Sequence, residues 1–264
     1  MNFRNGRIMS TYLWQNFLKD ASIIRTIATS IGHLYEKTWA KALIEIGPWK
    51  WAITKKIKDI SQCFFVIEKD LTMEEHLKEI WLDSNQIIFW DVLEQNIENL
   101  LDNRGVKEDE AVVVGNLPYY ITSPIFKHLF RKRNPKFLGW FFMIQDEVGE
   151  KIKSDAKKKS YLWWLVNRAY TVEYVKMVPA KCFSPAPKVK SCLMRFIKKD
   201  KPENVPYEKL EDFLNLFSPY SRKTLGKIAK MIEKKWTWSY SIPEELQIKR
   251  LEELNWEQLW MIIQ

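Results

Sequence analysis

Glycine is scarce in this sequence, and so is cysteine. The 264 residues include 8 glycines, whereas average usage of about 7% predicts about 18. The three cysteines, Cys63, Cys182 and Cys192, are odd in number and include no C-x-x-C spacing. This pattern indicates neither a disulfide framework nor a zinc site. We therefore expect no bound metal, and a reducing, cytoplasmic location.

Long hydrophobic runs are absent as well. The longest, at 137–144, is far too short to span a bilayer, and the N-terminal residues lack the hydrophobic segment of a signal peptide. Apolar residues still make up 46% of the chain and charged residues 28%, which is typical of a folded globular protein. We expect no membrane contact and, because no sustained self-complementary seam is evident, a monomer.

Positive charge is plentiful. The net charge is +9, and lysines and arginines form clusters at 131–136, 151–159 and 222–230. Such clusters suit a polyphosphate partner, because each neutralised phosphate releases counterions. A solvated basic surface without a partner explains the charge equally well.

Short apolar runs alternate with amphipathic segments over the first three quarters of the chain. The runs predict strands at 42–47, 63–68, 86–89, 111–116 and 137–145, with two more around 169–178 and 190–198. Helices are predicted between them, including 71–80 and 123–132, the latter with Ser123 as N-cap and Pro124 at its first position. This alternation predicts an α/β fold with a mostly parallel sheet covered on both faces, in which the two late strands form an antiparallel edge.

The pattern changes after residue 198. The segment KDKPENVP at 199–206 has the composition of a linker, and only helical periodicity follows it. We therefore predict two domains, an α/β domain at 1–198 and a small all-helical domain at 199–264.

Polar residues follow four successive predicted strands. Gly47, Glu68, Asp91 and Asn116 come at or just after the strand ends, which meet at one edge of a parallel sheet where ligands bind. Glycine permits close backbone approach, and the two acids suit ribose hydroxyls and an adenine amine. This series predicts a site for an adenosine-containing cofactor. Each residue alone would more often be a turn glycine or a helix cap, and the absence of G-x-G-x-x-G disfavours dinucleotide binding.

The segment NLPYY at 116–120 is the most specific motif. An exocyclic amine on a base is a poor nucleophile, so a site must accept hydrogen bonds from it and aim its lone pair at the methyl donor. The side-chain oxygen of Asn116 suits that task, Pro118 stiffens the turn, and Tyr119 offers a face on which an extruded base stacks. The competing interpretation is a plain strand-to-helix turn closed by Pro118.

Together these motifs resemble those of the rRNA adenine N6-dimethyltransferases, over nearly the whole chain. QNFL at 15–18, EIGP at 45–48, NLPYY, and FSPAPKVKS at 183–191 occur in the order typical of that family. SRKTLGKI at 221–228 resembles an element of the C-terminal helical domain and favours the small-subunit enzymes. The resemblance implies a Rossmann-like methyltransferase domain followed by a small helical domain.

The resemblance also implies a cofactor, a reaction and a partner. The cofactor is S-adenosyl-L-methionine, and the reaction is N6-dimethylation of adenines in 16S rRNA of the small ribosomal subunit or its precursor, in ribosome biogenesis. The implied cofactor-binding residues are Asn16, Leu18, Gly47, Glu68, Asp91 and Asn116. The implied catalytic residues are Asn116, Tyr119 and Phe183, with the two rings holding the target base. One alternative is a 23S rRNA adenine methyltransferase of the macrolide-resistance type.

Tryptophans stand where this family has glycines. Trp49 and Trp51 interrupt the cofactor loop, Trp14 precedes QNFL, Trp90 precedes Asp91, and Trp39 precedes the first predicted strand. The 13 tryptophans are in excess while glycine is deficient, so we hypothesise that UGA codons read as glycine in the source organism are rendered here as tryptophan. If these codons are instead UGG, a non-catalytic rRNA-binding assembly factor becomes the favoured alternative, because the two indoles block the cofactor loop.

Overall fold

A computed structural model describes residues 16–48, 52–130, 136–233 and 240–264. Its strands are β1 (Phe17–Leu18), β2 (Ala42–Ile46), β3 (Cys63–Glu68), β4 (Ile87–Phe89), β5 (Ala111–Asn116), β6 (Gly139–Gln145), β7 (Tyr170–Val178), β8 (Phe183–Ser184) and β9 (Ser191–Lys198). Its helices are α1 (Ala21–Thr38), α2 (Thr54–Ile57), α3 (Glu74–Lys78), α4 (Ile97–Asp102), α5 (Thr122–Phe130), α6 (Asp146–Ile152), α7 (Tyr161–Asn167), α8 (Tyr207–Phe217), α9 (Leu225–Glu233) and α10 (Trp256–Ile263).

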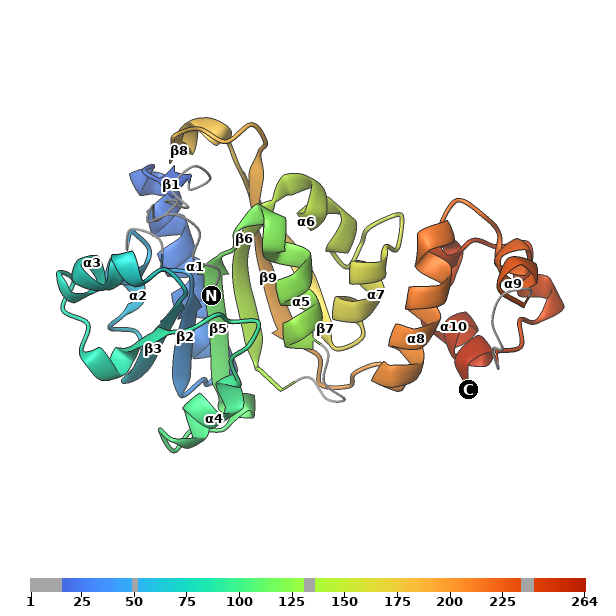
Figure 1. The fold of residues 1–264 in the computed structure, drawn as a ribbon, viewed down its shortest axis with the longest axis horizontal. Coiled ribbons are helices and arrows are strands. Elements are labelled where there is room, and N and C mark those ends of the chain that lie inside the picture. The colour runs from blue at the N-terminus through green and yellow to red at the C-terminus, as the bar shows by residue number, and fades with distance from the viewer. Residues whose placement is uncertain (1–15, 49–51, 131–135, 234–239) are drawn as a thin grey trace, which may run out of the picture.

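Seven of these strands form one sheet in the order β4-β3-β2-β5-β6-β9-β7. The five strands from β4 to β6 are parallel, and β9 is inserted antiparallel between β6 and β7 (Figure 1). The predicted α/β fold is therefore confirmed, and every predicted strand is present within about two residues of its expected bounds. The late strands β7 and β9 do bring antiparallel pairing to one edge of the sheet.

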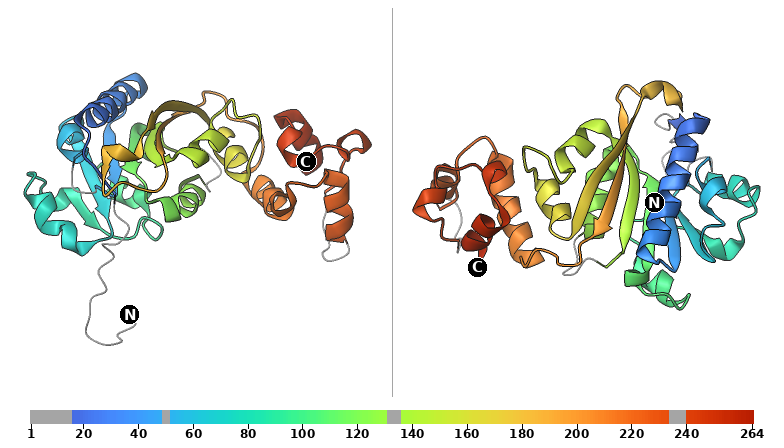
Figure 2. Two further views of the ribbon diagram at one scale, coloured as in Figure 1. Left: turned by 90° about the horizontal axis from the view of Figure 1, so that it is seen from above. Right: turned by 180° about the vertical axis from the view of Figure 1, so that it is seen from behind.

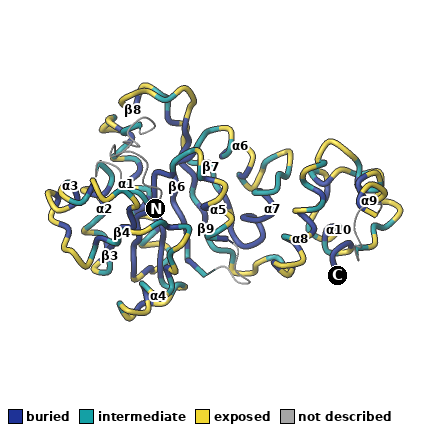
Figure 3. Tube along the Cα trace, viewed as in Figure 1, coloured by how far each residue is buried: buried dark blue, intermediate teal, exposed yellow. Residues whose placement is uncertain are grey.

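Helices cover both faces of the sheet because the strands are apolar on both sides. All five residues of β2 are buried. One face packs on α1, whose buried residues Ile23, Ile27, Ile31 and Leu34 recur at helical spacing. The other face packs on α4, α5 and α7, and the views from above and behind show these layers (Figure 2). Accordingly, the residues of the central strands are mostly buried (Figure 3).

Two local predictions are wrong. Ser123 is not the N-cap of α5, because the helix begins at Thr122, directly after a 3₁₀ turn at Tyr119–Ile121. The Thr122 hydroxyl donates to the carbonyl of Pro118 at 3.0 Å and joins the turn to the helix. The segment 243–254, in the region of predicted helical periodicity, instead forms the two 3₁₀ turns Glu244–Leu246 and Leu251–Glu253.

The C-terminal helices α8, α9 and α10 build a hydrophobic cluster of their own. It includes Trp163 and Trp164 of α7, so this helix contributes to both parts of the molecule. The linker is held to the connection between α7 and β7 by backbone hydrogen bonds from Lys199 to Ala169 at 2.9 Å and from Glu203 to Arg168 at 2.8 Å. These contacts fix the start of α8 against α7 (Figure 1).

Candidate active site at the carboxyl ends of the strands

The four residues predicted at strand ends, Gly47, Glu68, Asp91 and Asn116, lie at the carboxyl ends of the parallel strands. Ile46 of β2 is in register with Ile67 of β3 and with Gly115 of β5. Chain order reverses on the two sides of β2, so this edge is a topological switch point, the usual ligand site of an open α/β sheet. The residues that follow these positions, Gly47, Glu68 and Asn116, are therefore brought close together.

Two glycines allow the backbone of this edge to pack closely. Gly47 has a φ of 65°, in the left-handed region, and its N–H donates to the carbonyl of Ile67 at 2.9 Å. A Cβ added to Gly115 would lie 2.5 Å from the carbonyl oxygen of Ile46, which is too close for any side chain. Position 115, next to Asn116, therefore requires glycine, because it contacts β2, the strand that carries the EIGP motif.

We predict that Gly115→Ala destabilises the protein by about 1–3 kcal/mol, because backbone rather than a flexible side chain must move. The measurement is the urea midpoint of unfolding. Gly32→Ala is the matched control, since Gly32 lies inside α1 with nothing within 4 Å of an added Cβ. That change should stabilise by about 0.5–1 kcal/mol. Equal effects of the two substitutions would contradict the proposed close approach.

Glu68 fits the role of a ribose-binding acid. Its side chain is 6% exposed, and Oε1 accepts hydrogen bonds from the backbone N–H groups of Lys69 and Asp70 at 2.7 and 2.8 Å. The second oxygen, Oε2, is buried and has no hydrogen-bond partner among the described residues. A buried carboxylate oxygen without a partner is costly, and a ligand hydroxyl donating to it would satisfy it. Burial raises the pKa of this carboxyl above its usual value.

Asp91 is held by a residue that the sequence did not single out. Its Oδ2 lies 2.6 Å from Lys69 Nζ, and its Oδ1 accepts from the N–H of Leu93 at 3.0 Å. Burial works to raise the pKa of Asp91, but the bonds from Lys69 and Leu93 outweigh it and lower the pKa. The Lys69 side chain is 74% exposed, so this ion pair lies at the surface.

A second buried acid, Glu45, begins the EIGP segment at 45–48. It is 2% exposed in the centre of β2, and its Oε2 has no hydrogen-bond partner among the described residues. Burial, helped by the nearby Glu68, raises the pKa of Glu45 to about 8. The raised pKa favours the neutral form of this carboxyl, two residues before Gly47.

We predict that this raised pKa makes the protein less stable as the pH rises. The folded chain retains a proton that the unfolded chain releases, so stability is fully present below about pH 4.5 and falls up to about pH 8. Glu45→Gln should remove this dependence. The free energy of unfolding that the substitution adds should be larger at pH 8 than at pH 5 by about 1–3 kcal/mol. Urea unfolding at the two pH values measures it, and parallel pH profiles for both proteins would contradict the assignment.

The segment that carries Asn116 and Tyr119 is positioned by contacts with β6 and β9. Asn116 is 9% exposed, and the next residue, Leu117, donates its N–H to the carbonyl of Met143 at 3.1 Å. The Tyr119 hydroxyl is hydrogen-bonded to the Ser191 hydroxyl. Ser191 is fully buried and belongs to the FSPAPKVKS motif, which the sequence analysis used for Phe183 alone. The Tyr119 ring is thus fixed at both ends.

The N-terminal motif and the Phe183 motif meet in a small antiparallel sheet. β1 pairs with β8, with Leu18 opposite Phe183, and Lys19 donates its N–H to the carbonyl of Cys182 at 2.9 Å. Leu18 is buried and Asn16 is half-buried. Phe183 is 2% exposed and packs in the core on the α1 side. Its ring is covered, whereas Tyr119 remains partly exposed, so the expected pair of stacking rings does not form an open slot in this structure.

Three of the tryptophans at family glycine positions, Trp14, Trp49 and Trp51, lie outside the described residues. Trp90 is 53% exposed beside Asp91. Its N–H donates to the carbonyl of Glu68 at 2.9 Å, so its backbone joins the ends of β4 and β3.

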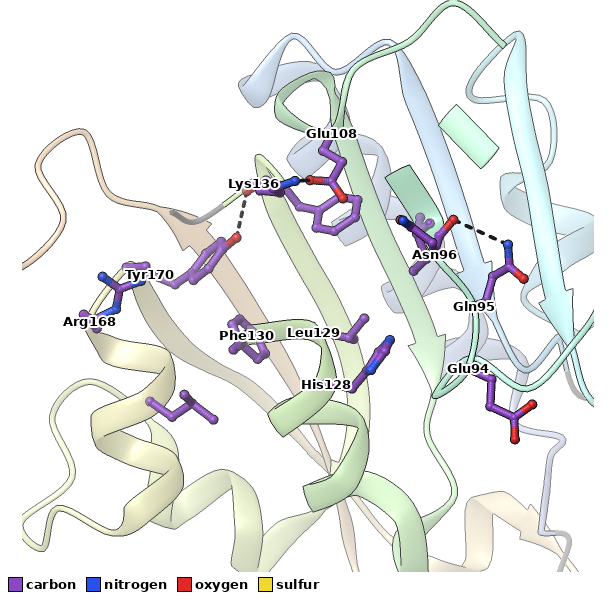
Figure 4. Close-up of a pocket in the computed structure, with 14 residues that line it drawn as sticks. Glu94, Gln95, Asn96, Glu108, His128, Leu129, Phe130, Lys136, Arg168 and Tyr170 are labelled. Atoms are coloured by element: carbon purple, nitrogen blue, oxygen red, sulfur yellow. Dashed lines mark hydrogen bonds and ion pairs between the residues drawn. The ribbon is translucent and has the colours of Figure 1, made fainter. Parts of the chain in front are cut away.

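A separate cavity of about 270 Å³ lies near the start of β6 and β7, between the loop before α4 and the end of α5. Figure 4 shows His128, Phe130 and Tyr170 around it, with Tyr170 donating its hydroxyl to the carbonyl of Phe137. It is at the opposite end of β6 from the residues discussed above. It borders residues 131–135, which lie outside the described residues, so we assign it no function.

Within the described parts of the chain, no helix is long and apolar enough to cross a membrane. In the same parts, no group of three or more histidine, cysteine or acidic side chains is arranged to hold a metal ion.

The sheet order is that of a Rossmann-like methyltransferase fold, which solved methyltransferase structures share. More particularly, the chain belongs to the ribosomal RNA adenine dimethylase family, whose model matches residues 9–264.

Individual proteins agree with this assignment. The ribosomal RNA small subunit methyltransferase A of Hydrogenobaculum sp. (strain Y04AAS1) is 30% identical over 254 residues, covering 93% of this chain and 88% of that protein. Its namesake from Clostridium botulinum (strain Loch Maree / Type A3) is 33% identical over 230 residues, covering 83% and 79%. A dimethyladenosine transferase from Plasmodium falciparum has a similar fold, with a TM-score of 0.70 at 20% identity, covering 93% and 95% of the two chains. The 23S rRNA methyltransferase ErmE also shares the fold, with a TM-score of 0.61 at 23% identity, covering 84% and 85%.

Proposed function

We propose that this protein transfers methyl groups from S-adenosylmethionine to the N6 amine of adenines in 16S rRNA of the small ribosomal subunit. The observation that carries the proposal is the position of Asn116, fixed and almost buried at the end of β5. On the other side of β2, Glu68 ends β3 and Asp91 follows the end of β4. A base amine held at Asn116 thus faces the edge at which an adenosine-containing cofactor would lie.

The chain's own residues bind and orient the two reactants. When bound, S-adenosylmethionine supplies an activated methyl group. Asn116 accepts a hydrogen bond from the adenine amine through its side-chain oxygen and directs the lone pair. Tyr119, fixed by Ser191, offers its face to the extruded base, and Phe183 completes the stack once uncovered. Positioning of this kind dominates the rate of a direct group transfer.

Exposed lysines support RNA as the partner. Lys181, Lys188 and Lys190 flank Phe183 on an exposed segment, and Arg222, Lys223 and Lys227 lie in the helical domain. Contacts of these side chains with phosphates release counterions, so RNA binding should weaken steeply with added salt. We also propose that the protein acts in the cytoplasm and as a monomer.

The test is a methylation assay on purified subunits that lack the modification. The protein is incubated with S-adenosylmethionine and either small or large subunits, and modified adenines are found as stops in primer extension. Stops in 16S rRNA support the proposal, and stops only in 23S rRNA would replace it with the macrolide-resistance type of activity. RNA binding without any stops, in a protein that binds the cofactor, would favour a non-catalytic assembly factor.

A further inference from the structure

Four of the described residues have a backbone φ in the left-handed region. Two are glycines, Gly47 and Gly105, with φ of 65° and 69°. The other two are both tryptophans, Trp39 at 54° and Trp81 at 65°. For a bulky side chain this conformation is a genuine outlier, because the Cβ crowds the carbonyl oxygen. The backbone thus singles out the same residue type that interrupts the glycine motifs.

The end of α1 shows why the conformation is required at Trp39. The N–H of Trp39 donates to the carbonyl of Glu36 at 3.1 Å, and the N–H of Ala40 donates to the carbonyl of Tyr35 at 3.2 Å. These two bonds define a Schellman motif, whose left-handed position is usually glycine. The motif turns the chain sharply into β2, so another backbone conformation would lose both bonds.

The end of α4 repeats this motif with a glycine in the same place. Gly105 donates its N–H to the carbonyl of Asp102 at 3.0 Å, and Val106 donates to the carbonyl of Leu101 at 3.1 Å. The hydrogen bonds have the same spacing as those around Trp39, and the φ values agree within the usual scatter. The chain itself therefore shows which residue suits this position.

Trp81 belongs to none of the sequence motifs, and only its backbone identifies it. It follows α3, and its N–H donates to the carbonyl of Lys78 at 3.0 Å. Its side chain is 86% exposed, and that of Trp39 is 89% exposed, so neither indole gains from packing. Trp39 precedes β2 and Trp81 precedes β4, so both lie at the amino ends of the parallel strands, whereas Asn116 lies at a carboxyl end. They are therefore poorly placed to stack on a target base.

Trp140 is different. It lies in β6, is fully buried, and its ring contacts Phe137 and Phe130 at centroid distances of 4.7 and 5.1 Å. Its backbone has no positive φ. A glycine there would leave a large cavity, so position 140 requires a large apolar side chain.

We infer that the working form of this protein carries glycine at positions 39 and 81, because UGA codons are read as glycine. Position 140 is a true tryptophan, encoded by UGG. The inference rests on backbone geometry and does not depend on the proposed function. It assigns glycine at Trp81, where no family motif suggested it.

The direct test combines the coding DNA with mass spectrometry of the protein isolated from the cells that encode it. We expect UGA codons and glycine-containing peptides at 39 and 81, with UGG and a tryptophan-containing peptide at 140. UGG at 39 and 81, or tryptophan in both of those peptides, would overturn the inference.

A second test measures the full-length chain with tryptophan at each position. Trp39→Gly and Trp81→Gly should each raise the folded-to-unfolded ratio about 5- to 30-fold, as expected for relief of a left-handed residue. Trp39→Ala and Trp81→Ala remove the exposed indole but keep the Cβ, so they should give less than half of that gain in free energy. Trp140→Gly should lower the ratio more than about 100-fold. Equal gains for alanine and glycine would show that exposure, not backbone conformation, is the cause, and would overturn the structural argument.

Discussion

Replacing Trp49 and Trp51 together by glycine is expected to raise the affinity for S-adenosylmethionine by roughly 100-fold or more, equivalent to about 3 kcal/mol. The loop follows Gly47, which is left-handed. At the end of the neighbouring strand β3, the buried Oε2 of Glu68 is without a hydrogen-bond partner in the described residues. These features suit a cofactor whose methionine portion approaches the backbone closely. An indole at a position meant for glycine occupies that space.

Isothermal titration calorimetry with the cofactor on both proteins measures this effect. Trp39→Gly/Trp81→Gly is the matched control, because it makes the same two chemical changes away from the strand ends. It should raise stability and leave the cofactor affinity of the chain as written unchanged. Equally tight binding by the chain as written would show that the indoles are tolerated, and binding by neither protein would defeat the assignment of an enzyme.

Asn116→Ala in the Trp49→Gly/Trp51→Gly protein is expected to lower the rate of methyl transfer by about 10²–10³-fold, the usual cost of removing one preorganised hydrogen-bonding group. Asn116 ends β5, which lies between β2 and β6, and alanine at this position has no side-chain oxygen to accept a hydrogen bond. RNA affinity should be largely unchanged, because that affinity comes from phosphate contacts with exposed lysines and arginines.

Single-turnover rates and filter binding to unmethylated subunits separate these two effects. Asn103→Ala is the control, since Asn103 is exposed at the end of α4 and should leave both quantities unchanged. A loss of RNA affinity equal to the loss of rate would indicate that Asn116 supports the fold of the binding surface rather than the reaction.

The strand positions were predictable from the sequence because burial on both faces of a parallel sheet demands continuous apolar runs. The start of α5 was not predictable, because two competing signals overlap there. Ser123 before an apolar stretch looks like an N-cap, whereas the hydrogen bond from Thr122 to Pro118 begins the helix one residue earlier. Likewise, the helical periodicity of 243–254 did not reveal that the segment divides into two 3₁₀ turns.

By itself, the sequence determined the fold class, the order of the strand-end residues Gly47, Glu68, Asp91 and Asn116, and the misfit of tryptophan in the cofactor loop. These are properties of local pattern and spacing, which the chain carries without folding. Only the tertiary structure decided which distant residues meet: Lys69 with Asp91, Ser191 with Tyr119, and β1 with β8. It alone also identified Trp81, because a left-handed φ depends on how the turn after α3 joins the sheet and leaves no mark in the residue pattern.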